Sequence, residues 1–545
     1  MGFFTLDADA SVPVKGLWAN RQSIGYAFVF CLAAAQYGFD YGLTGAFMAM
    51  VGFLKVFGYE APNSPIGWNI STVVQQLITS LMVIGGVVGS LAQGPLSSYM
   101  GRRRGMQIAC VVCIVACAIM ISTTSVGALY VARIILGIAN GIFITTAQMY
   151  IVEVLPANLR GVGLGMYAMV IVIAVTLSTI ITRFTKNYTD RLCYQVPLAV
   201  MMGLPAVTFV LTQFCPESPR WLISRGRDDD ARKALNRLRG PNYSNTEIAE
   251  EFAAMQAHHE AEHMAGKDKP KFMDLFKGTD RRRTVLSLCA VSMHAGSGSQ
   301  FLINYGIFDF LKIQLITGTY FFTMAGVVDP FTMSIASNVV GIGGTIMSLY
   351  SIRLVGRRIQ LIVGTSCCGL AQLIAAAVYT AHPGTKTSGQ VLTAMSAIYN
   401  FFYCGTISPY AWTIGAELTT QRLRSYTIGL GSALNFVLAW AITFSAPYFI
   451  NLANLNWGAK YGWIWFVSCF IMVAWMYFYL PETKDRTLEE LDELFEARVP
   501  ARKFKSYICV KTRQAMDHGV AEEIVGTEKE KAYEVEDIRE TTRNH

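Results

Sequence analysis

Two side chains of opposite charge lie deep inside apolar stretches of the sequence. Asp40 stands within the apolar run 24–47 and Arg133 within the run 127–151. No other basic residue is as deep in the first half of the chain. Because an ionisable group inside a membrane helix is costly unless it is paired or functional, the two residues are expected to contact each other. They form either a static ion pair or a pair that opens when the carboxylate takes up a proton.

Charged residues also recur at matching positions in the two halves of the chain. Each half has a Gly-Arg-Arg triplet after one apolar run, a glutamate seven residues before an arginine after another, and a Pro-Glu pair after a third. The recurring residues are Arg102, Arg103, Glu153, Arg160, Glu217 and Arg220 in the first half, and Arg357, Arg358, Glu417, Arg424 and Glu482 in the second. A spacing of seven residues places both side chains on one helix face. These charges form either a latch that closes in one state and opens in another, or a set of solvated helix ends.

Three further patterns resemble chemical motifs but lack the context that those motifs need. His259-Glu-Ala-Glu-His263 has zinc-protease spacing, but it lies in an Ala/Glu-rich stretch with no evident third ligand, which favours a solvated helix. Cys110-Val-Val-Cys113 lies within an apolar run, where thiols pack as small hydrophobes. The glycines within 161–165 follow no strand, and no Walker motif exists. The sequence therefore predicts no metal, no cofactor and no enzymatic activity.

The charged clusters separate apolar runs that are long enough to cross a membrane. The 545 residues are 53% hydrophobic and 15% charged, with a mean hydropathy of +0.37, whereas a soluble chain carries about a quarter charged residues. A spanning helix needs about 20 apolar residues. Such runs lie at 24–47, 73–98, 105–124, 127–151, 162–183 and 194–214, and again at 284–312, 331–353, 359–381, 390–416, 426–450 and 461–480. The sequence therefore predicts an integral protein of the lipid bilayer.

The basic residues set the expected orientation. Short clusters of Lys and Arg, rather than one basic domain, make up the net charge of +8, which argues against nucleic-acid binding. By the positive-inside rule, the loops that carry these clusters and both termini are cytosolic. Of the three Asn-X-Ser/Thr sequons, Asn69 and Asn187 then lie on the opposite side, where glycosylation is expected if it occurs at all, whereas Asn242 lies in the cytosol and stays bare.

The matched positions in the two halves predict the fold. The expected parts are a cytosolic N-terminus (1–23), a six-helix bundle (24–215), a cytosolic central loop (216–283), a second six-helix bundle (284–480) and a cytosolic tail (481–545). The fold class is an all-α membrane protein with twelve transmembrane helices in two pseudo-symmetric bundles. Transporters built in this way bind their substrate near the membrane midplane, between the halves.

Four segments, in order and at helix ends, resemble the sugar porter family of the major facilitator superfamily. They are Gly38-Phe-Asp-Tyr-Gly42, Tyr150-Ile-Val-Glu-Val-Leu-Pro-Ala-Asn-Leu-Arg-Gly161, Pro216-Glu-Ser-Pro-Arg-Trp-Leu222 and Pro481-Glu-Thr-Lys-Asp-Arg-Thr-Leu-Glu-Glu490. The similarity extends over about residues 24–505. Within the family, the chain is most similar to fungal α-glucoside and general sugar permeases, through the stretch 406–424. The resemblance implies the major facilitator fold and secondary transport.

The resemblance also implies roles for individual residues. An Asp at position 40 is typical of proton-coupled members, which assigns proton coupling to Asp40 and Arg133. The substrate-binding residues that it implies are Gln300, Asn304, Trp412, Asn435 and His294. Each of these could equally be a satisfied polar contact between helices. The chain departs from the family pattern where His294 replaces a glutamine and where Ala168 replaces a sugar-binding glutamine.

These observations predict a monomeric, proton-coupled importer of a small molecule in the plasma membrane. The expected substrate is a sugar, with an α-glucoside among the candidates. The departures at the binding positions leave a second interpretation open, namely transport of a non-sugar metabolite such as a specialised-metabolism product. A third interpretation is a non-transporting sugar receptor, against which a tail of only about 65 residues argues mildly.

Overall fold

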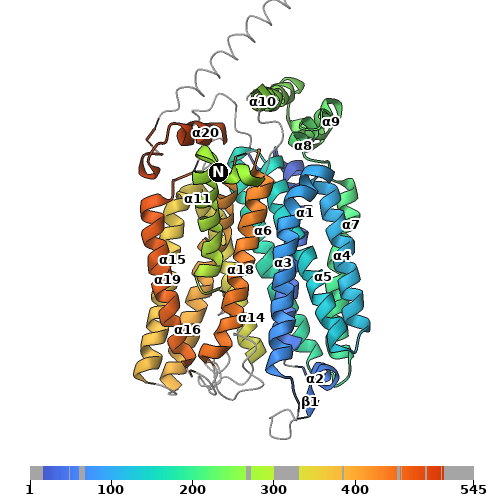
Figure 1. The fold of residues 1–545 in the computed structure, drawn as a ribbon, viewed down its shortest axis with the longest axis vertical. Coiled ribbons are helices and arrows are strands. Elements are labelled where there is room, and N and C mark those ends of the chain that lie inside the picture. The colour runs from blue at the N-terminus through green and yellow to red at the C-terminus, as the bar shows by residue number, and fades with distance from the viewer. Residues whose placement is uncertain are drawn as a thin grey trace, which may run out of the picture.

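Long helices run side by side through most of the chain (Figure 1). The computed structural model describes residues 16–47, 50–60, 68–264, 272–299, 330–382, 386–420, 422–450, 455, 457–484, 486, 488–504 and 506–507. Within these stretches, nine helices are long and apolar enough to cross a membrane. Where the structure describes them, the predicted apolar runs fall on helices, apart from a turn at 297–298 within the run 284–312 and a few residues at the ends of other runs.

The long helices form two groups, here called the N bundle and the C bundle. The N bundle contains α1 (Arg21–Phe47), α3 (Thr72–Met100), α4 (Arg102–Ser122), α5 (Val126–Val154), α6 (Ala157–Thr185) and α7 (Leu192–Phe214). The C bundle contains α11 (Gly278–Gly296), α14 (Pro330–Leu354), α15 (Arg357–Ala381), α16 (Lys386–Phe402), α17 (Ser408–Glu417), α18 (Arg424–Ile450) and α19 (Gly462–Tyr479). A π-helical turn, Tyr403–Ile407, joins α16 to α17, so that together they occupy the run expected at 390–416.

Short elements cover the two ends of the bundles. One end carries α8 (Pro219–Ile223), α9 (Asp228–Arg239), α10 (Asn245–Met264) and α20 (Leu488–Glu496), and is here called the loop face. The opposite end carries α2 (Val51–Phe57) and a two-stranded antiparallel hairpin of β1 (Tyr59–Glu60) and β2 (Trp68–Asn69). Single 3-10 turns lie at Gly240–Asn242, Phe272–Phe276, Gly458–Tyr461 and Ala501–Lys503.

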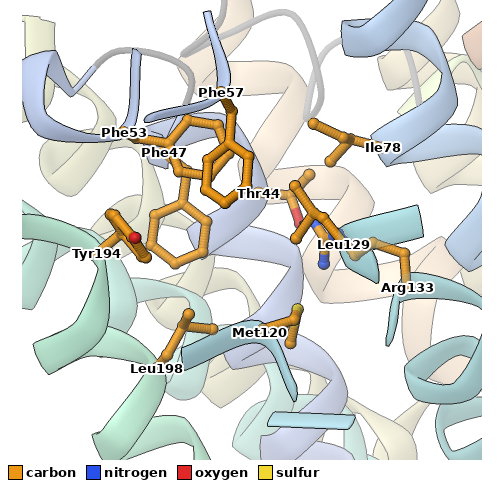
Figure 2. A pocket seen from close by; sticks show the side chains of 10 residues that line it. All are labelled: Thr44, Phe47, Phe53, Phe57, Ile78, Met120, Leu129, Arg133, Tyr194 and Leu198. Carbon is orange, nitrogen blue, oxygen red and sulfur yellow. The ribbon is translucent and has the colours of Figure 1, made fainter. Parts of the chain in front are cut away.

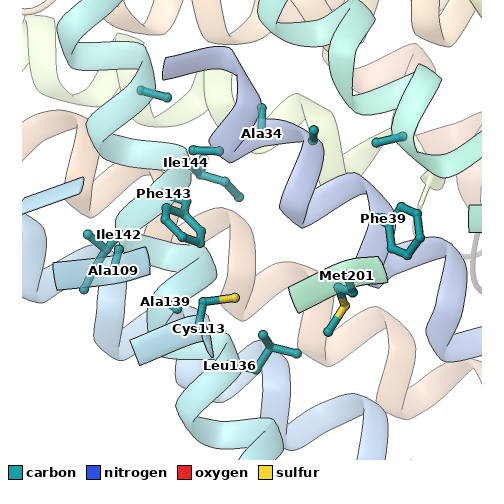
Figure 3. Packing of buried hydrophobic residues seen from close by; sticks show 14 of the residues in the cluster. Ala34, Phe39, Ala109, Cys113, Leu136, Ala139, Ile142, Phe143, Ile144 and Met201 are labelled. Atoms are coloured by element: carbon teal, nitrogen blue, oxygen red, sulfur yellow. The ribbon is translucent and has the colours of Figure 1, made fainter. Parts of the chain in front are cut away.

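Small residues allow the N-bundle helices to approach closely. A Cβ on Gly137 of α5 would lie 2.0 Å from the carbonyl oxygen of Met82 in α3, so only glycine fits there. Cys113 of α4 is fully buried and lies near Ala139 of α5 (Figure 3). Close packing of small residues is the usual means of helix association in lipid, where burial of apolar surface gives no driving force between helices. The thiol at Cys113 therefore packs, as the sequence predicts.

The two bundles meet along two seams, one between α3 and α18 and one between α6 and α14. In the first seam, a Cβ on Gly429 would lie 2.7 Å from the carbonyl oxygen of Ser90, and one on Gly86 would meet the ring of Phe436 at 3.0 Å. In the second, Asn338 Nδ2 donates to Thr179 Oγ1 at 3.4 Å. The substrate site expected between the bundles is therefore bounded on two sides by these helices.

Two buried arginines attach the loop-face helices to the bundles. Arg239 of α9 pairs with Glu251 of α10 at 2.5 Å and donates to the carbonyl oxygen of Val154 at the end of α5. Arg283 pairs with Asp492 of α20 and donates to the carbonyl of Leu418. The central region 216–283 is thus largely helical, and α11 already begins at Gly278, before the start expected at 284.

The run expected as one span over 284–312 is interrupted in the structure. Its helix α11 ends at Gly296, and a turn follows in which Gly298 adopts a φ of +82°. A Cβ on Gly298 would also lie 2.7 Å from the indole of Trp465, so glycine is required on both counts. Residues 300–329, which include the predicted binding residues Gln300 and Asn304, lie outside the described residues.

Candidate functional site

An acid and a base meet in the middle of the N bundle. Arg133 Nη1 donates to Asp40 Oδ1 at 2.8 Å, and Asn140 Nδ2 donates to Asp40 Oδ2 at 3.1 Å. The second guanidinium nitrogen of Arg133 donates to Thr44 Oγ1 at 2.6 Å. The side chains of Asp40 and Arg133 are only 1% and 2% exposed. Each carboxylate oxygen of Asp40 therefore accepts one hydrogen bond from a side chain of α5.

Helical spacing brings these four side chains together. Asp40 and Thr44 are one turn apart on α1, while Arg133 and Asn140 are two turns apart on α5, so each pair shares a helix face. The structure places Asp40 and Arg133 in contact, as expected, and their role in proton coupling stays a prediction. Sequence reasoning missed Thr44 and Asn140, although the seven-residue spacing from Arg133 to Asn140 was an available signal.

A pocket adjoins this ion pair on the side of α2. Thr44 and Arg133 line it together with apolar and aromatic side chains. Figure 2 shows the rings of Phe47, Phe53 and Phe57 gathered beside Thr44 and the Arg133 guanidinium. Phe53 also lies edge-on to Tyr194 of α7, with ring centroids 5.6 Å apart. The aromatic rings therefore separate the ion pair from the α2 end of the molecule.

An imidazole and two aromatic rings form a second cluster, in the C bundle. His294 Nε2 and the Tyr403 hydroxyl are hydrogen-bonded at 2.7 Å, and their rings are 5.4 Å apart. The ring of Trp412 lies 5.9 Å from that of His294. Among the described residues, His294 Nδ1 has no hydrogen-bond partner. The structure thus groups two predicted binding residues, His294 and Trp412, and adds Tyr403, which the π-helical turn positions and the sequence did not reveal.

Asn435 of α18 is the remaining predicted binding residue that the structure describes. Its side chain is buried, and within the described part of the chain its Oδ1 accepts no hydrogen bond. The following residue, Phe436, lies edge-on to Tyr37 of α1 across the bundle boundary, with centroids 6.2 Å apart. Aromatic rings from both bundles and the amide of Asn435 therefore lie at the boundary between the bundles.

On the loop face, a glutamate caps a helix in the N bundle. Glu217 accepts hydrogen bonds from the backbone N–H groups of Arg102 at 2.9 Å and Arg103 at 3.1 Å, at the start of α4. The side chain of Arg102 pairs with Glu153 at 2.6 Å. Burial raises the pKa of the Glu217 carboxyl above its usual value, although the backbone N–H of Ser218 and the Arg102 charge act in the opposite direction.

The C bundle repeats this arrangement. Glu482 accepts from the backbone N–H groups of Arg357 at 3.0 Å and Arg358 at 3.2 Å, at the start of α15. The side chain of Arg357 pairs with Glu417 at 3.4 Å, and Thr483 donates to the same carboxylate at 2.6 Å. The recurring charges of the sequence are therefore connected in the same way in both halves.

Two further arginines of the set bend back on their own chain. Arg160 Nε donates to the carbonyl of Leu155 at 3.3 Å, and Arg424 Nε donates to Thr419 Oγ1 at the same distance. Both are buried. The charge of Arg424 also acts on Glu153, which belongs to the other bundle. The charges therefore interact across the bundle boundary, and Arg160 and Arg220 lie close enough to Arg424 for their charges to repel it.

Other expectations concern metals and glycosylation. Among the residues that the structure describes, no group of three or more His, Cys, Asp or Glu could hold a metal ion. The segment His259–His263 lies in α10. Asn187 is exposed after α6, near α2, and Asn69 belongs to β2 on the same end. Asn242 is on the loop face, where its Nδ2 donates to the carbonyl of Ala19 at 3.1 Å.

Family models, curated relatives and solved structures all relate this chain to membrane transporters. The family described as sugar (and other) transporters matches residues 26–495. The chain is 27% identical to the major facilitator-type transporter ecdD of Aspergillus rugulosus, over 84% of both chains. It is 28% identical to the low-affinity glucose transporter HXT1 of Saccharomyces cerevisiae, over 88% of this chain and 82% of the relative. Among solved structures, the proton:xylose symporter XylE bound to 6-bromo-6-deoxy-D-glucose superposes with a TM-score of 0.73 at 19% identity, over 87% of this chain and all of that one.

Proposed function

Because the chain belongs to the sugar porter family of the major facilitator superfamily and has its twelve-helix, two-bundle fold, we propose that it takes up a sugar together with a proton. The observation that carries this proposal is the buried pair of Asp40 and Arg133 in the N bundle. A buried ion pair contributes little to stability by itself, and one that is kept inside a membrane helix suggests a function.

The geometry suggests how a proton drives the cycle. Asp40 holds the Arg133 guanidinium in place, and Thr44 is the second acceptor of that guanidinium. Protonation of Asp40 removes the negative charge, so that Arg133 is released and the relative stability of the two facing states changes. Since Asp40 and Arg133 lie on α1 and α5, release of the pair loosens the contact between these helices.

The second cluster supplies the means to bind a sugar. Trp412 offers an aromatic face to the C–H surface of a pyranose ring, and the imidazole of His294 and the hydroxyl of Tyr403 offer hydrogen bonds. One relative is a glucose transporter by name, which supports a monosaccharide as substrate. An α-glucoside remains one of the candidates.

Transport and pH recording together test this proposal. The chain is expressed in a yeast strain that lacks its own sugar transporters, and uptake of labelled glucose, xylose, galactose and maltose is measured while the external pH is recorded. We expect at least one sugar to accumulate against its gradient with an alkaline shift outside, and a protonophore to abolish the accumulation. Sugar entry without any pH change and without accumulation would leave sugar transport but contradict proton coupling.

One observation favours a second candidate, transport of a non-sugar metabolite. Ala168, which is buried in α6, cannot make the hydrogen bond of the glutamine that the family pattern places there. The relative from Aspergillus rugulosus is named only as a major facilitator-type transporter. This candidate becomes the better one if no sugar of the panel is transported while the protein is present at the cell surface.

We further propose that the loop face is cytosolic, in a monomer that resides in the plasma membrane. The buried and exposed arginines gathered on this face support the orientation. Glycosylation tests it, because Asn187 lies at the opposite end and Asn242 on the loop face. A glycan-dependent mass shift that disappears in Asn242→Gln would contradict the orientation, and one that disappears in Asn187→Gln or Asn69→Gln would agree with it.

A further inference from the structure

A glutamine in the N bundle has unused hydrogen-bonding capacity. Gln148 of α5 is 1% exposed, and among the described residues neither its Oε1 nor its Nε2 makes a hydrogen bond of good geometry, although the Tyr167 hydroxyl of α6 lies close enough to interact with the amide. A buried polar group without a partner costs about 1–3 kcal/mol. A residue kept at that cost is a candidate for a functional role, since an apolar side chain of the same size would be more stable there.

The internal repeat shows which way Gln148 faces. In α5, Gln148 precedes Glu153 by five residues, and in α17, Trp412 precedes Glu417 by five residues. The two glutamates occupy equivalent places, because each pairs with the first arginine of a Gly-Arg-Arg triplet. That arginine is Arg102 at the start of α4 in one half and Arg357 at the start of α15 in the other. Gln148 is therefore the N-bundle counterpart of Trp412, which points toward the cluster of His294 between the bundles.

Packing agrees with this assignment. Helices α5 and α17 contact each other across the bundle boundary. Trp412 and Ala416 belong to the same continuous apolar cluster as the N-bundle residues that flank Gln148, namely Ala147 and Ile151. Gln148 and Trp412 thus approach the boundary from opposite sides, as two-fold-related residues must.

From this relation we propose that Gln148 is a substrate-recognising residue of the N bundle. Its amide offers one acceptor and two donors, which match two adjacent hydroxyls of a polyhydroxylated ring, while Trp412 covers the apolar face of the same ring. Gln148 then supplies the N-bundle hydrogen bonds that Ala168 cannot make. The inference rests on the proposed function, because it assumes that the substrate is a cyclic polyol.

The chain contains a matched control. Gln93 of α3 is also fully buried, and neither atom of its amide has a partner in the described part of the chain. It faces away from the C bundle, because its Nε2 is the nearest atom, at 3.7 Å, to a Cβ built on Gly105 at the start of α4. Replacing Gln93 removes the same buried amide without touching the boundary between the bundles.

Uptake kinetics with sugars that lack single hydroxyls test the proposal. Glucose and its 2-, 3-, 4- and 6-deoxy analogues are offered to wild type, Gln148→Leu and Gln93→Leu at equal surface abundance. We expect Gln148→Leu to raise KM for glucose by about tenfold to a hundredfold, and Gln93→Leu to leave it within about twofold. At least one deoxy analogue should bind wild type more weakly than glucose but bind Gln148→Leu as well as glucose does. Gln148→Met, which is nearly isosteric, replaces the leucine variant if that protein does not reach the surface.

Each result tests either the role of Gln148 or the proposed function on which that role rests. If wild type transports glucose and Gln148→Leu keeps the same KM and the same analogue pattern, the role of Gln148 is overturned while the proposed function stands. If Gln93→Leu loses affinity equally, the effect reports packing, and the role of Gln148 is overturned as well. If wild type transports none of these sugars, the proposed function fails, and the recognition of a cyclic polyol by Gln148 fails with it.

Discussion

The two bundles share the arrangement of their loop-face ends but differ in their interiors. At the loop face, Glu217 and Glu482 cap equivalent helices, and Glu153 and Glu417 pair with equivalent arginines. Inside, the N bundle holds the ion pair of α1 and α5, whereas α16 and α17 contain no charged residue between Lys386 and Glu417. In the part of the C bundle that the structure describes, the corresponding interior region presents the rings of the His294 cluster.

This difference suggests a division of labour between the halves. When the two bundles rock past each other, the contacts that close one end of the transporter open while those at the other end form. Such a movement uses equivalent contacts on both bundles. Proton coupling needs only one titratable site, and a second charged pair in the C bundle would add the cost of burial without a second proton. We therefore expect substitutions at the loop face to act alike in both halves and substitutions in the interiors to act differently.

The largest expected effect concerns Asp40. In Asp40→Asn the side chain keeps its volume and stays neutral, so the proton-dependent step is lost while packing survives. Accumulation of sugar against its gradient should disappear, and exchange or downhill flux should remain measurable. Flux with and without a proton gradient, at equal surface abundance, gives the answer. Asp230→Asn, which removes the carboxylate of an exposed ion pair with Arg227, is the matched control and should transport normally.

A static ion pair predicts a different outcome for the same variant. Removing one partner of a buried pair then leaves the Arg133 charge uncompensated, at a cost of about 3–5 kcal/mol, and the protein should be poorly expressed. Proton-driven accumulation that persists in Asp40→Asn would contradict the assignment of coupling to the N bundle and with it the proposed division of labour.

Trp412→Ala tests the other interior. The indole is 9% exposed and lies against His294, so its loss removes a stacking face from the cluster. We expect KM to rise by about tenfold or more, with little change in delivery to the membrane. Trp412→Phe should recover much of the affinity. Trp463→Ala, in the more exposed part of α19, serves as the control. If Trp463→Ala reaches the membrane but Trp412→Ala does not, Trp412 is a packing residue.

The loop face should respond in the same direction to substitutions in either half. Glu153→Gln and Glu417→Gln each remove one buried carboxylate charge, at a cost of about 1.5–3 kcal/mol. If the charges latch the bundles, either variant should increase amide hydrogen exchange at the starts of both α4 and α15. Glu153→Gln should have the larger effect, because the pair of Glu153 with Arg102 is shorter than that of Glu417 with Arg357. Solvated helix ends predict no more change than in the exposed control Glu250→Gln.

The apolar runs and repeated motifs predicted most of the fold from the sequence. Runs of about 20 apolar residues map directly onto spanning helices, because lipid requires each span to satisfy its own backbone hydrogen bonds. In the central region the sequence predicted a helix around His259, which lies in α10. Helices α9 and α20 were not predicted, since they are held by Arg239 and Arg283, whose partners Val154 and Asp492 are far away in the sequence. The need for glycine at position 298, in the turn after α11, also involves a distant residue, because Trp465 leaves no room for a Cβ there.

The candidate site was predictable only in part. The partners Asp40 and Arg133 stood out because charges are rare in apolar runs, and the repeat of Glu153 and Glu417 was visible as a pattern. Tyr403 was missed because a π-helical turn sets its direction, and ordinary helical periodicity does not predict such a turn. The roles of Gln300 and Asn304 stay predictions.

The smallest expected effect is a difference in stability between alanine variants of the glycines in the two Gly-Arg-Arg triplets. A Cβ on Gly101 would lie 2.5 Å from a carboxylate oxygen of Glu217, and one on Gly356 would lie 2.2 Å from a carboxylate oxygen of Glu482. The steric cost of an alanine is therefore similar in the two halves. The backbones differ, however, because Gly101 has a φ of +88° and a ψ of 175°, whereas Gly356 has a φ of −63°.

Gly101→Ala should consequently be the less stable of the two variants. Its backbone conformation is open almost only to glycine and adds about 1–3 kcal/mol of strain, whereas Gly356→Ala requires only that the Glu482 side chain move. The temperature at which half of the detergent-solubilised protein aggregates should fall in both variants and fall further in Gly101→Ala. Adding Glu217→Gln or Glu482→Gln to the respective variant weakens the capping hydrogen bonds and should leave this order unchanged. The reverse order would mean that helix capping by Glu482, and not backbone strain at Gly101, limits the stability of the loop face.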